Sequence, residues 1–569
     1  MLEHRYWLTT VTRLRHFVQV FGNNWSNSRI CGAAESIHAW KIVYWGIAAF
    51  VFLLGARNRF SLPQDPLADT DYGYLLPALN KLGGGAFEQL HAVNFLYPGF
   101  VYLVLRMFGD FRAITILQHL LGLAAGGLFL ATWNRIGSFF EKPRLPVYFH
   151  QAIGLCGAGI YLLANNPVLF ESRIRSDAVC MFFEMLAFWF AVGLFYHQTI
   201  TQNRREALFY ALATVLSCSV LASLKPSFLL TSLLILGSVG LLVVNRMRSV
   251  DRIIIIGWSA GVILAVIAFQ QFFSRGDDVT KRFLPQTLFA FHANIIDEQM
   301  RTDLERGAVP FESRAWLQTA CDNLENEIRH TRSLYPNAYR RLGYQADYLV
   351  SAPDALLARW RSELGERRYL EFLGYWYRHS LVRRPLEFAR KIALQMAVFY
   401  SPDCPTFNAR RRLSLNYSAS LEALSNPKIE RLLAKSPAGV SFMERTQHLQ
   451  STNDAIEELR IVHLFQKLCG RTYLALLVFA LAVAGWFFLK DRDSAGGLPP
   501  ALLALGFYGA NFGNVLGISI VHSMEVWRYS GVQFIAALFA YFWAIRWLIE
   551  VALAKWASVM RTHTCSNLS

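Results

Sequence analysis

Residues 253–273 read IIIIGWSAGVILAVIAFQQFF, a run of 21 residues without a charged side chain. A helix needs about 20 mainly apolar residues to cross the hydrocarbon core of a bilayer. Apolar blocks of similar length recur down the whole chain, so a single cleaved signal peptide cannot account for them. The sequence therefore predicts an all-α polytopic membrane protein.

The composition of the 569 residues agrees with this class. Of these residues 54% are hydrophobic and 17% are charged, against about 25% charged in soluble domains. The net charge of +16 comes from Lys and Arg spread between the apolar blocks, which argues against nucleic-acid binding and fits cytoplasmic loops beside anionic lipids. The eight cysteines have no CxxC spacing, and neither a Walker A sequence nor GxGxxG is present. Zinc, thioredoxin-like and soluble nucleotide chemistry are therefore not indicated.

Ten segments fit membrane spans. With a cytoplasmic N-terminus, ten spans put the basic loops 133–146, 198–206, 245–252 and 490–497 inside, as the positive-inside rule requires. The short apolar stretch 95–108 would invert every later loop if it were a span, so we expect an interfacial or re-entrant helix there. The predicted spans are 41–56, 112–132, 147–164, 178–197, 207–223, 227–244, 253–273, 471–489, 498–519 and 527–548.

This topology divides the chain into three parts. Residues 1–273 form an N-terminal transmembrane module of seven spans with a first outer loop at 57–111, and residues 471–569 form a C-terminal module of three spans. Between them, residues 274–470 form an extracytoplasmic domain whose sequence favours helices over a β-sandwich; Pro385, for example, opens an apolar run as a first-turn proline does. The short loops and compact N-terminus indicate a bacterial inner membrane, with the outer loops in the periplasm.

Ionisable residues gather at the predicted outer ends of the spans. Charges near the apolar region are costly and usually face a cavity, so their gathering on one side indicates an outward-facing active site. Plainer explanations exist: a loop aspartate is usually solvated, arginines can anchor at headgroups, Lys225 can snorkel, and His292 can be a packing residue. The candidates are Asp69, Asp71, Glu171, Arg173, Arg175, Asp177, Lys225, His292, Glu525, Arg528 and Tyr529.

The order of these residues resembles the GT-C superfamily of polyprenyl-phosphate-dependent glycosyltransferases, in the branch of protein O-mannosyltransferases and lipid A aminoarabinose transferases. In that family an acidic pair follows the first span, as in Asp69-Thr70-Asp71-Tyr72, and a short outer turn ends in an acid, as in 171–177. A lysine between paired spans resembles Lys225, and a late Glu/Arg/Tyr signature resembles 525–529. The likeness covers most of 41–273 and the last span.

The resemblance implies an inverting glycosyltransferase that moves a sugar from a polyprenyl-phosphate donor to a glycan, lipid or protein hydroxyl. The family pair is often adjacent Asp-Glu, so the Asp-Thr-Asp spacing leaves open whether Asp69 or Asp71 is the general base. No cofactor is required, although a divalent cation could bind these two carboxylates. The expected donor-phosphate ligands are Lys225, Arg528, Arg173 and Arg175, with Asp177, Glu171, Glu525, Tyr529 and His292 in support.

We further expect Lys225, Arg528 and one of Arg173 or Arg175 to converge on one anion, because cations this close repel one another without an anion between them. Two other classes of function remain open. A transporter or flippase of a lipid-linked or anionic substrate would favour inverted repeats and charges at the midplane of the membrane. A non-catalytic scaffold would only present the 274–470 domain.

Overall fold

The computed structural model describes residues 30–69, 72–87, 94–140, 143–273, 278–308, 313–334, 344–352, 354–401, 404–451, 455–490, 498–521 and 526–566. The chain divides into two compact units, Met1–Leu53 and Leu54–Ser569. The contacts described below all lie within the second unit.

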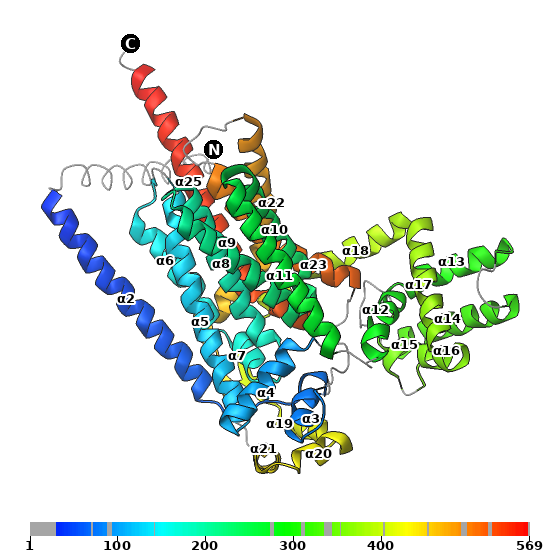
Figure 1. Ribbon diagram of the computed structural model, residues 1–569. Helices are drawn as coiled ribbons and strands as arrows, with labels where there is room; N and C mark the ends of the chain where they lie inside the picture. The colour runs from blue at the N-terminus through cyan, green and yellow to red at the C-terminus, as the bar shows by residue number, and fades with distance from the viewer. Residues whose placement is uncertain are drawn as a thin grey trace, which may run out of the picture. The chain divides into compact units, whose positions relative to one another are not determined.

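The predicted all-α polytopic membrane protein is confirmed. Eight helical segments in the described ranges are long and apolar enough to cross a membrane, and a ninth results if a bent helix pair counts as one span. The eight (Figure 1) are Ala39–Phe60 in α2 (Ile30–Phe60), Arg112–Phe139 in α5 (Arg112–Ile136) with η2 (Gly137–Phe139), α8 (Asp177–Thr199), α9 (Arg204–Leu224), Ser249–Phe272 in α11 (Ser249–Phe273), Arg460–Phe487 in α22 (Arg460–Lys490), Pro500–Val521 in α23 (Leu498–Val521) and Phe534–Ala557 in α25 (Phe534–Ser566).

The other two predicted spans have a different form. Residues 147–164 lie on α6 (Val147–Leu163), which is followed by α7 (Asn165–Glu171) at a bend of 50°. Ala164 between them has extended backbone, with φ −74° and ψ 142°, so the helical hydrogen bonding is interrupted there. Residues 227–244 lie on η3 (Pro226–Phe228) and α10 (Leu229–Arg246), whose apolar part, Pro226–Gly240, is shorter than the eight long segments.

Helix α8 lies at the centre of the membrane helices, because it packs against α5, α7, α9, α10 and α25. Helix α25 in turn packs against α6, α22 and α23, and α10 packs against α23. Helix α11 packs mainly against α9 and is largely exposed, as a helix facing lipid would be. The ends of α8 and α9 are therefore held by neighbours on several sides.

The first outer loop contains η1 (Tyr72–Tyr74), α3 (Leu76–Leu82) and α4 (Leu96–Phe108). Helix α4 covers the stretch for which a helix too short to span was predicted, and its 13 residues confirm that length. It ends at Gly109, whose φ of 63° is the left-handed conformation that glycine adopts without strain.

The segment 274–470 is mainly helical, as predicted. Pro385 does lie in the first turn of a helix, α18. The two strands in the described part of this segment have three residues each and pair antiparallel, with Leu413 opposite Ile456. The elements are α12 (Asp278–Phe291), α13 (Ala293–Glu305), α14 (Arg314–Leu334), α15 (Tyr348–Ser351), α16 (Leu356–Leu364), α17 (Glu366–Arg383), α18 (Pro385–Phe399), η4 (Pro405–Phe407), β1 (Arg412–Ser414), α19 (Tyr417–Leu424), α20 (Pro427–Leu433), α21 (Pro437–Leu449) and β2 (Ala455–Glu457).

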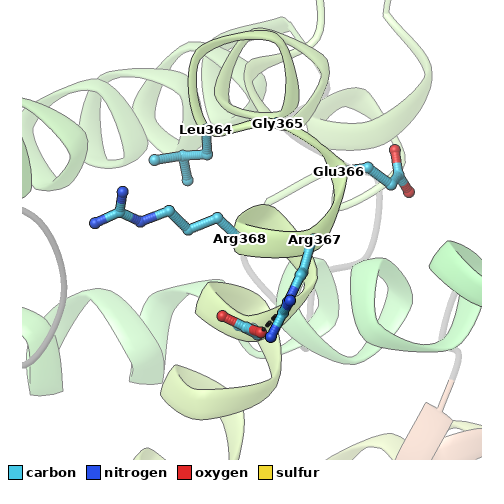
Figure 2. Close-up of a pocket in the computed structure, with 6 residues that line it drawn as sticks. Leu364, Gly365, Glu366, Arg367 and Arg368 are labelled. Atoms are coloured by element: carbon cyan, nitrogen blue, oxygen red, sulfur yellow. Dashed lines mark hydrogen bonds and ion pairs between the residues drawn. The ribbon is translucent and has the colours of Figure 1, made fainter.

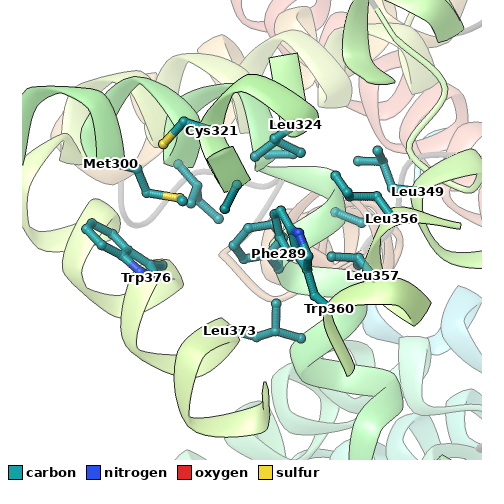
Figure 3. Close-up of a cluster of buried hydrophobic side chains, with 14 of the residues drawn as sticks. Phe289, Met300, Cys321, Leu324, Leu349, Leu356, Leu357, Trp360, Leu373 and Trp376 are labelled. Carbon is teal, nitrogen blue, oxygen red and sulfur yellow. The ribbon is translucent and has the colours of Figure 1, made fainter. Parts of the chain in front are cut away.

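Helices α12–α17 share one hydrophobic core. Figure 3 shows Phe289, Trp360 and Leu373 at its centre, with Trp376 beside Met300. The rings of Phe289 and Trp360 meet edge to face at 5.8 Å, which is a favourable arrangement for aromatic pairs. This core gives the helical part of 274–470 its own source of stability.

Strand β1 and helices α19–α21 instead pack against the first outer loop and α7. Leu62, Leu67 and Val168 share a buried cluster with Leu413 and Leu415. The phenolic oxygen of Tyr417 donates to the backbone oxygen of Asp65 at 2.8 Å, and the Arg445 guanidinium pairs with the Asp65 carboxylate at 2.7 Å. The second half of 274–470 thus holds the loop that carries Asp69.

Contacts divide the helix ends into two groups that match the two predicted sides of the membrane. Among segments predicted inside, Arg204 forms two 2.7 Å hydrogen bonds with Asp251, and Glu550 accepts a hydrogen bond from the backbone nitrogen of Leu145 at 3.2 Å. Among segments predicted outside, Arg445 joins Asp65 to Asp110. The grouping of the ends therefore agrees with the charge pattern of the loops.

A buried ion pair joins the end of α2 to the end of α7. The Nε and Nη2 atoms of Arg59 donate to the two carboxylate oxygens of Glu171 at 2.7 and 2.9 Å, and Nη1 donates to the backbone oxygen of Leu162 at 2.8 Å. The Nδ1 atom of His119 lies 2.9 Å from the same carboxylate. A Cβ atom at Gly122 would lie 2.0 Å from Oε1 of Glu171, so only glycine admits this carboxylate beside α5.

The predicted orientation can be tested with two exposed positions, Val440 and Ser138. We expect Val440→Cys to react with a membrane-impermeant maleimide added to intact cells, because residues 274–470 are predicted outside. Ser138→Cys should react only after the membrane is permeabilised. The wild-type chain, treated in the same way, controls for its native cysteines. The reverse labelling pattern would contradict the predicted orientation of every loop.

The buried pair yields a second prediction. Arg59→Met or Glu171→Leu alone should destabilise the protein by about 3–5 kcal/mol, because each leaves an uncompensated buried charge. The double apolar variant Arg59→Met, Glu171→Leu should lose much less than the sum of the two single losses. Thermal unfolding in detergent measures this cycle, and Arg367→Met at a largely exposed pair with Glu371 is the control. Additive losses would show that the pair does not couple.

Candidate functional site

Three backbone features bring charged side chains to one end of α8 and α9. Asp177 is the first residue of α8, where the positive end of the helix dipole favours an anion. Lys225 follows α9 in extended backbone, with φ −150° and ψ 113°, as expected for the residue before a proline. Arg528 lies on the short helix α24 (Val526–Gly531).

Lys225 and Arg528 meet at the carboxylate of Asp177. The Lys225 ammonium donates to one oxygen, and Nε of Arg528 lies 3.5 Å from the other. All three side chains are buried. The ring of Tyr529 lies beneath both cations, 4.4 Å from Nζ of Lys225 and 5.3 Å from Cζ of Arg528, so its π face adds to their stabilisation.

A second ion pair joins Asp69 of the first outer loop to Arg175. Leu67 forms a parallel bridge with Arg173: its nitrogen donates to Ser172 at 2.7 Å, and its oxygen accepts from Ile174 at 3.0 Å. Burial acts to raise the pKa of Asp69, but the guanidinium of Arg175 beside it, with Arg173 and Arg528, outweighs burial and lowers that pKa. Asp69 is therefore held as a carboxylate and is a weaker base than an ordinary aspartate.

The two pairs form one cluster of charged side chains. Arg175 and Arg528 both interact electrostatically with Asp177, and Arg528 also does so with Asp69. Burial, Arg175 and Arg410 lower the pKa of Arg173. Among the described residues, the cluster thus gathers four cations and two carboxylates: Arg173, Arg175, Lys225, Arg528, Asp69 and Asp177. We refer to these six residues as the ion cluster.

Side chains that were not identified from the sequence support the ion cluster. The hydroxyl of Tyr74 accepts a 3.5 Å hydrogen bond from Nη2 of Arg528, and the Tyr74 ring meets the ring of Tyr97 edge to face at 5.5 Å. The Tyr97 hydroxyl donates to Gln118 at 2.7 Å, and the Gln118 amide donates to the backbone oxygen of Arg173 at 3.0 Å. In the sequence, the one indication of this supporting contact was a glutamine, Gln118, inside an apolar span.

The expected convergence of cations needs one correction. It was expected to require a bound phosphate, but Asp177 lies between Lys225 and Arg528 and itself supplies an anion. Two like charges 4 Å apart repel by about 4 kcal/mol at an effective dielectric constant of 20, and the carboxylate of Asp177 offsets such repulsion between Lys225 and Arg528.

Other predicted site residues lie elsewhere. Glu171 points away from the cluster to Arg59 and His119. The Nδ1 atom of His292 lies 3.0 Å from the backbone oxygen of Leu288, and its Nε2 atom lies 3.2 Å from Nζ of Lys391. Burial of Lys391 lowers its pKa to about 7, and His292 packs in the helical part of 274–470. Asp71 and Glu525 lie outside the described residues.

Two other features lie apart from the ion cluster. In the ranges that the structure describes, no group of three or more His, Cys, Asp and Glu side chains has a geometry suited to a metal ion. A pocket of about 410 Å³ lies at the start of α17, far in sequence from the ion cluster. Figure 2 shows Arg367 in this pocket paired with the neighbouring carboxylate, which is that of Glu371 at 3.0 Å, while Arg368 extends to the other side.

The ion cluster is therefore the candidate site. It combines buried cations, a fixed carboxylate at a helix start and a second carboxylate on the first outer loop, all at one end of the membrane helices. In comparisons with known proteins, no family model and no curated sequence matches this chain.

Proposed function

We propose that the protein is an inverting glycosyltransferase that moves a sugar from a polyprenyl-phosphate donor to an acceptor hydroxyl at the outer face of the membrane. The observation that supports this most directly is the gathering of four cations at one end of the membrane helices, two of them on the buried carboxylate of Asp177. The membrane helices support a lipid-linked donor, and the proposed location is a bacterial inner membrane with the site facing the periplasm.

The charge of the cluster suits the chemistry of the leaving group. A polyprenyl-phosphate sugar is a phosphodiester with one negative charge. When the acceptor oxygen attacks the anomeric carbon and the bond to the phosphate oxygen breaks, the released monoester develops a second negative charge. Fixed cations that meet this developing charge lower the barrier, because they need no reorganisation during the reaction.

Arg528 and Lys225 have different proposed roles. The planar fork of Arg528 can bind two phosphate oxygens, whereas the ammonium of Lys225 acts as a point charge. Asp177 contacts both and is a positioning residue that fixes where their donors point. Arg173 and Arg175 add charge from the turn before α8, and Tyr74 and Tyr529 hold the Arg528 side chain against rotation.

The acceptor hydroxyl has a high pKa and needs a general base in the same site. Asp69 and Asp71 remain the two candidates. Within the ion cluster Asp69 pairs with Arg175, and its lowered pKa favours a role in positioning that arginine. Asp71 is two residues further along the same loop. The proton of the acceptor would pass to whichever carboxylate acts as the base while the lipid phosphate leaves.

The phosphate site can be tested without knowing the sugar. We expect purified protein in nanodiscs to bind polyprenyl phosphate more tightly than uncharged polyprenol. Arg528→Lys keeps the charge but loses the paired hydrogen bonds, so it should weaken polyprenyl-phosphate binding by about 10- to 100-fold. Arg367→Lys, on the exposed face of α17, is the matched control and should bind as the wild type does. Equal binding of phosphate and polyprenol would argue against a lipid-phosphate donor.

The two aspartates should separate in a transfer assay with a panel of polyprenyl-phosphate sugars. Loss of a general base costs on the order of 10²–10⁴ in rate, so the base variant, Asp69→Asn or Asp71→Asn, should lose kcat with donor KM little changed. The positioning variant should instead raise the donor KM. Full activity of the double variant would exclude both residues as the base.

A further inference from the structure

A second candidate site lies on α22, beside Tyr400 at the end of α18. A pocket of about 580 Å³ opens there. Its wall contains no residue of the ion cluster. The lining residues are Tyr400, Arg471, Leu474, Ala475, Val478, Phe479 and Ala482.

The spacing of the lining residues makes one continuous apolar stripe. Leu474, Ala475, Val478, Phe479 and Ala482 follow one another at intervals of one and three residues, which puts them on one face of a helix. From Leu474 to Ala482 the stripe runs roughly 12 Å at 1.5 Å per residue. The hydrocarbon core of one leaflet is about 15 Å, half of a 30 Å bilayer core. The stripe therefore matches the depth of a single leaflet.

Arg471 marks the polar end of this stripe. It lies one helical turn before Ala475, and its side chain is exposed. The preceding turns of α22 carry two more exposed cations, Arg460 and Lys467, beside exposed Leu464 and Leu468. Exposed basic and apolar residues on the same turns are typical of a helix at the membrane surface. Arg471 is the cation that lines the pocket itself, so this pocket complements a lipid with an anionic headgroup.

The floor of the pocket is rigid. The hydroxyl of Tyr400 donates to Oδ1 of Asn511 at 3.1 Å, and the Tyr400 ring lies parallel to the ring of Tyr473 with 6.2 Å between centroids. Tyr400 also packs against the buried cluster of Phe399, Val515 and Ile518. These contacts tie α18, α22 and α23 together at the pocket.

We propose that this pocket binds an anionic membrane phospholipid, with its phosphate at Arg471 and an acyl chain along α22. The lipid would lie in the leaflet on the same side as the ion cluster, because the chain enters α22 directly from the 404–459 segment that holds Asp65. This site is independent of the proposed transferase activity, and its test does not use that activity.

The probes are dioctanoyl phosphatidylglycerol and dioctanoyl phosphatidylcholine, titrated into the delipidated full-length protein and measured by native mass spectrometry. We expect phosphatidylglycerol to bind at least about tenfold more tightly, roughly the effect of one charged hydrogen bond. Arg471→Gln should abolish this preference. Ala475→Trp places a large side chain in the groove at an exposed position, so it should weaken the binding of both lipids. Arg460→Gln, on the same helix but outside the pocket, is the matched control and should leave both affinities within about twofold of wild type.

Each other outcome overturns the proposal. If Arg471→Gln and Ala475→Trp bind as the wild type does, the pocket holds no lipid. If Arg460→Gln loses as much preference as Arg471→Gln, a diffuse basic surface attracts the headgroup. If inorganic phosphate displaces phosphatidylglycerol, the site recognises a free anion, and if polyprenyl phosphate displaces it at lower concentration, the pocket belongs to the donor. Thermal unfolding of each variant verifies that it is folded.

Discussion

The carboxylate of Asp177 is the anion at which three distant parts of the chain meet. Lys225 arrives from the end of α9, Arg528 from α24, and both interact with this one side chain at the start of α8. In a poorly solvated setting neither cation would be stable beside the other without it. Because α8 packs at the centre of the membrane helices, Asp177 has a fixed position, and α24 must lie close to it.

A single turn carries both buried charge sites. Glu171 at the end of α7 pairs with Arg59, and Asp177, six residues later, pairs with Lys225 and Arg528. The bend after Ala164 makes this possible, because α7 leaves the direction of α6 and brings the turn between α7 and α8 beneath the first outer loop. The bridge from Leu67 to Arg173 then joins that loop to the turn. The Arg59–Glu171 pair fixes the turn to the membrane helices, and Asp177 at the end of the same turn contacts the cations of the candidate site.

Several features followed from the sequence because they depend on local composition. The length of the apolar runs predicted the long helices, and the charges of the loops predicted which helix ends lie on the same side. The order of the charged elements predicted that Lys225 and Arg528 lie close together. The predicted span 147–164 ended at the break, but the helix α7 that follows was missed because its polar start, Asn165-Asn166-Pro167, resembles a turn. The Arg59 partner of Glu171 was missed because it lies 112 positions away and depends on that break. Asp177 was identified only as a supporting residue, since a sequence does not show which of several nearby carboxylates the cations will contact.

The two carboxylates of the ion cluster matter for the proposed reaction as well as its cations. Asp69 pairs with Arg175, and Asp177 pairs with Lys225 and Arg528, so part of the attraction that these cations could offer a bound anion is already used within the protein. A phosphodiester donor carries one negative charge and the monoester product approaches two. A site accelerates a reaction only by binding the transition state more strongly than the ground state. In the proposed transfer, the fixed cations would supply that difference, because they would attract the charge that develops as the bond breaks more strongly than the charge of the bound donor.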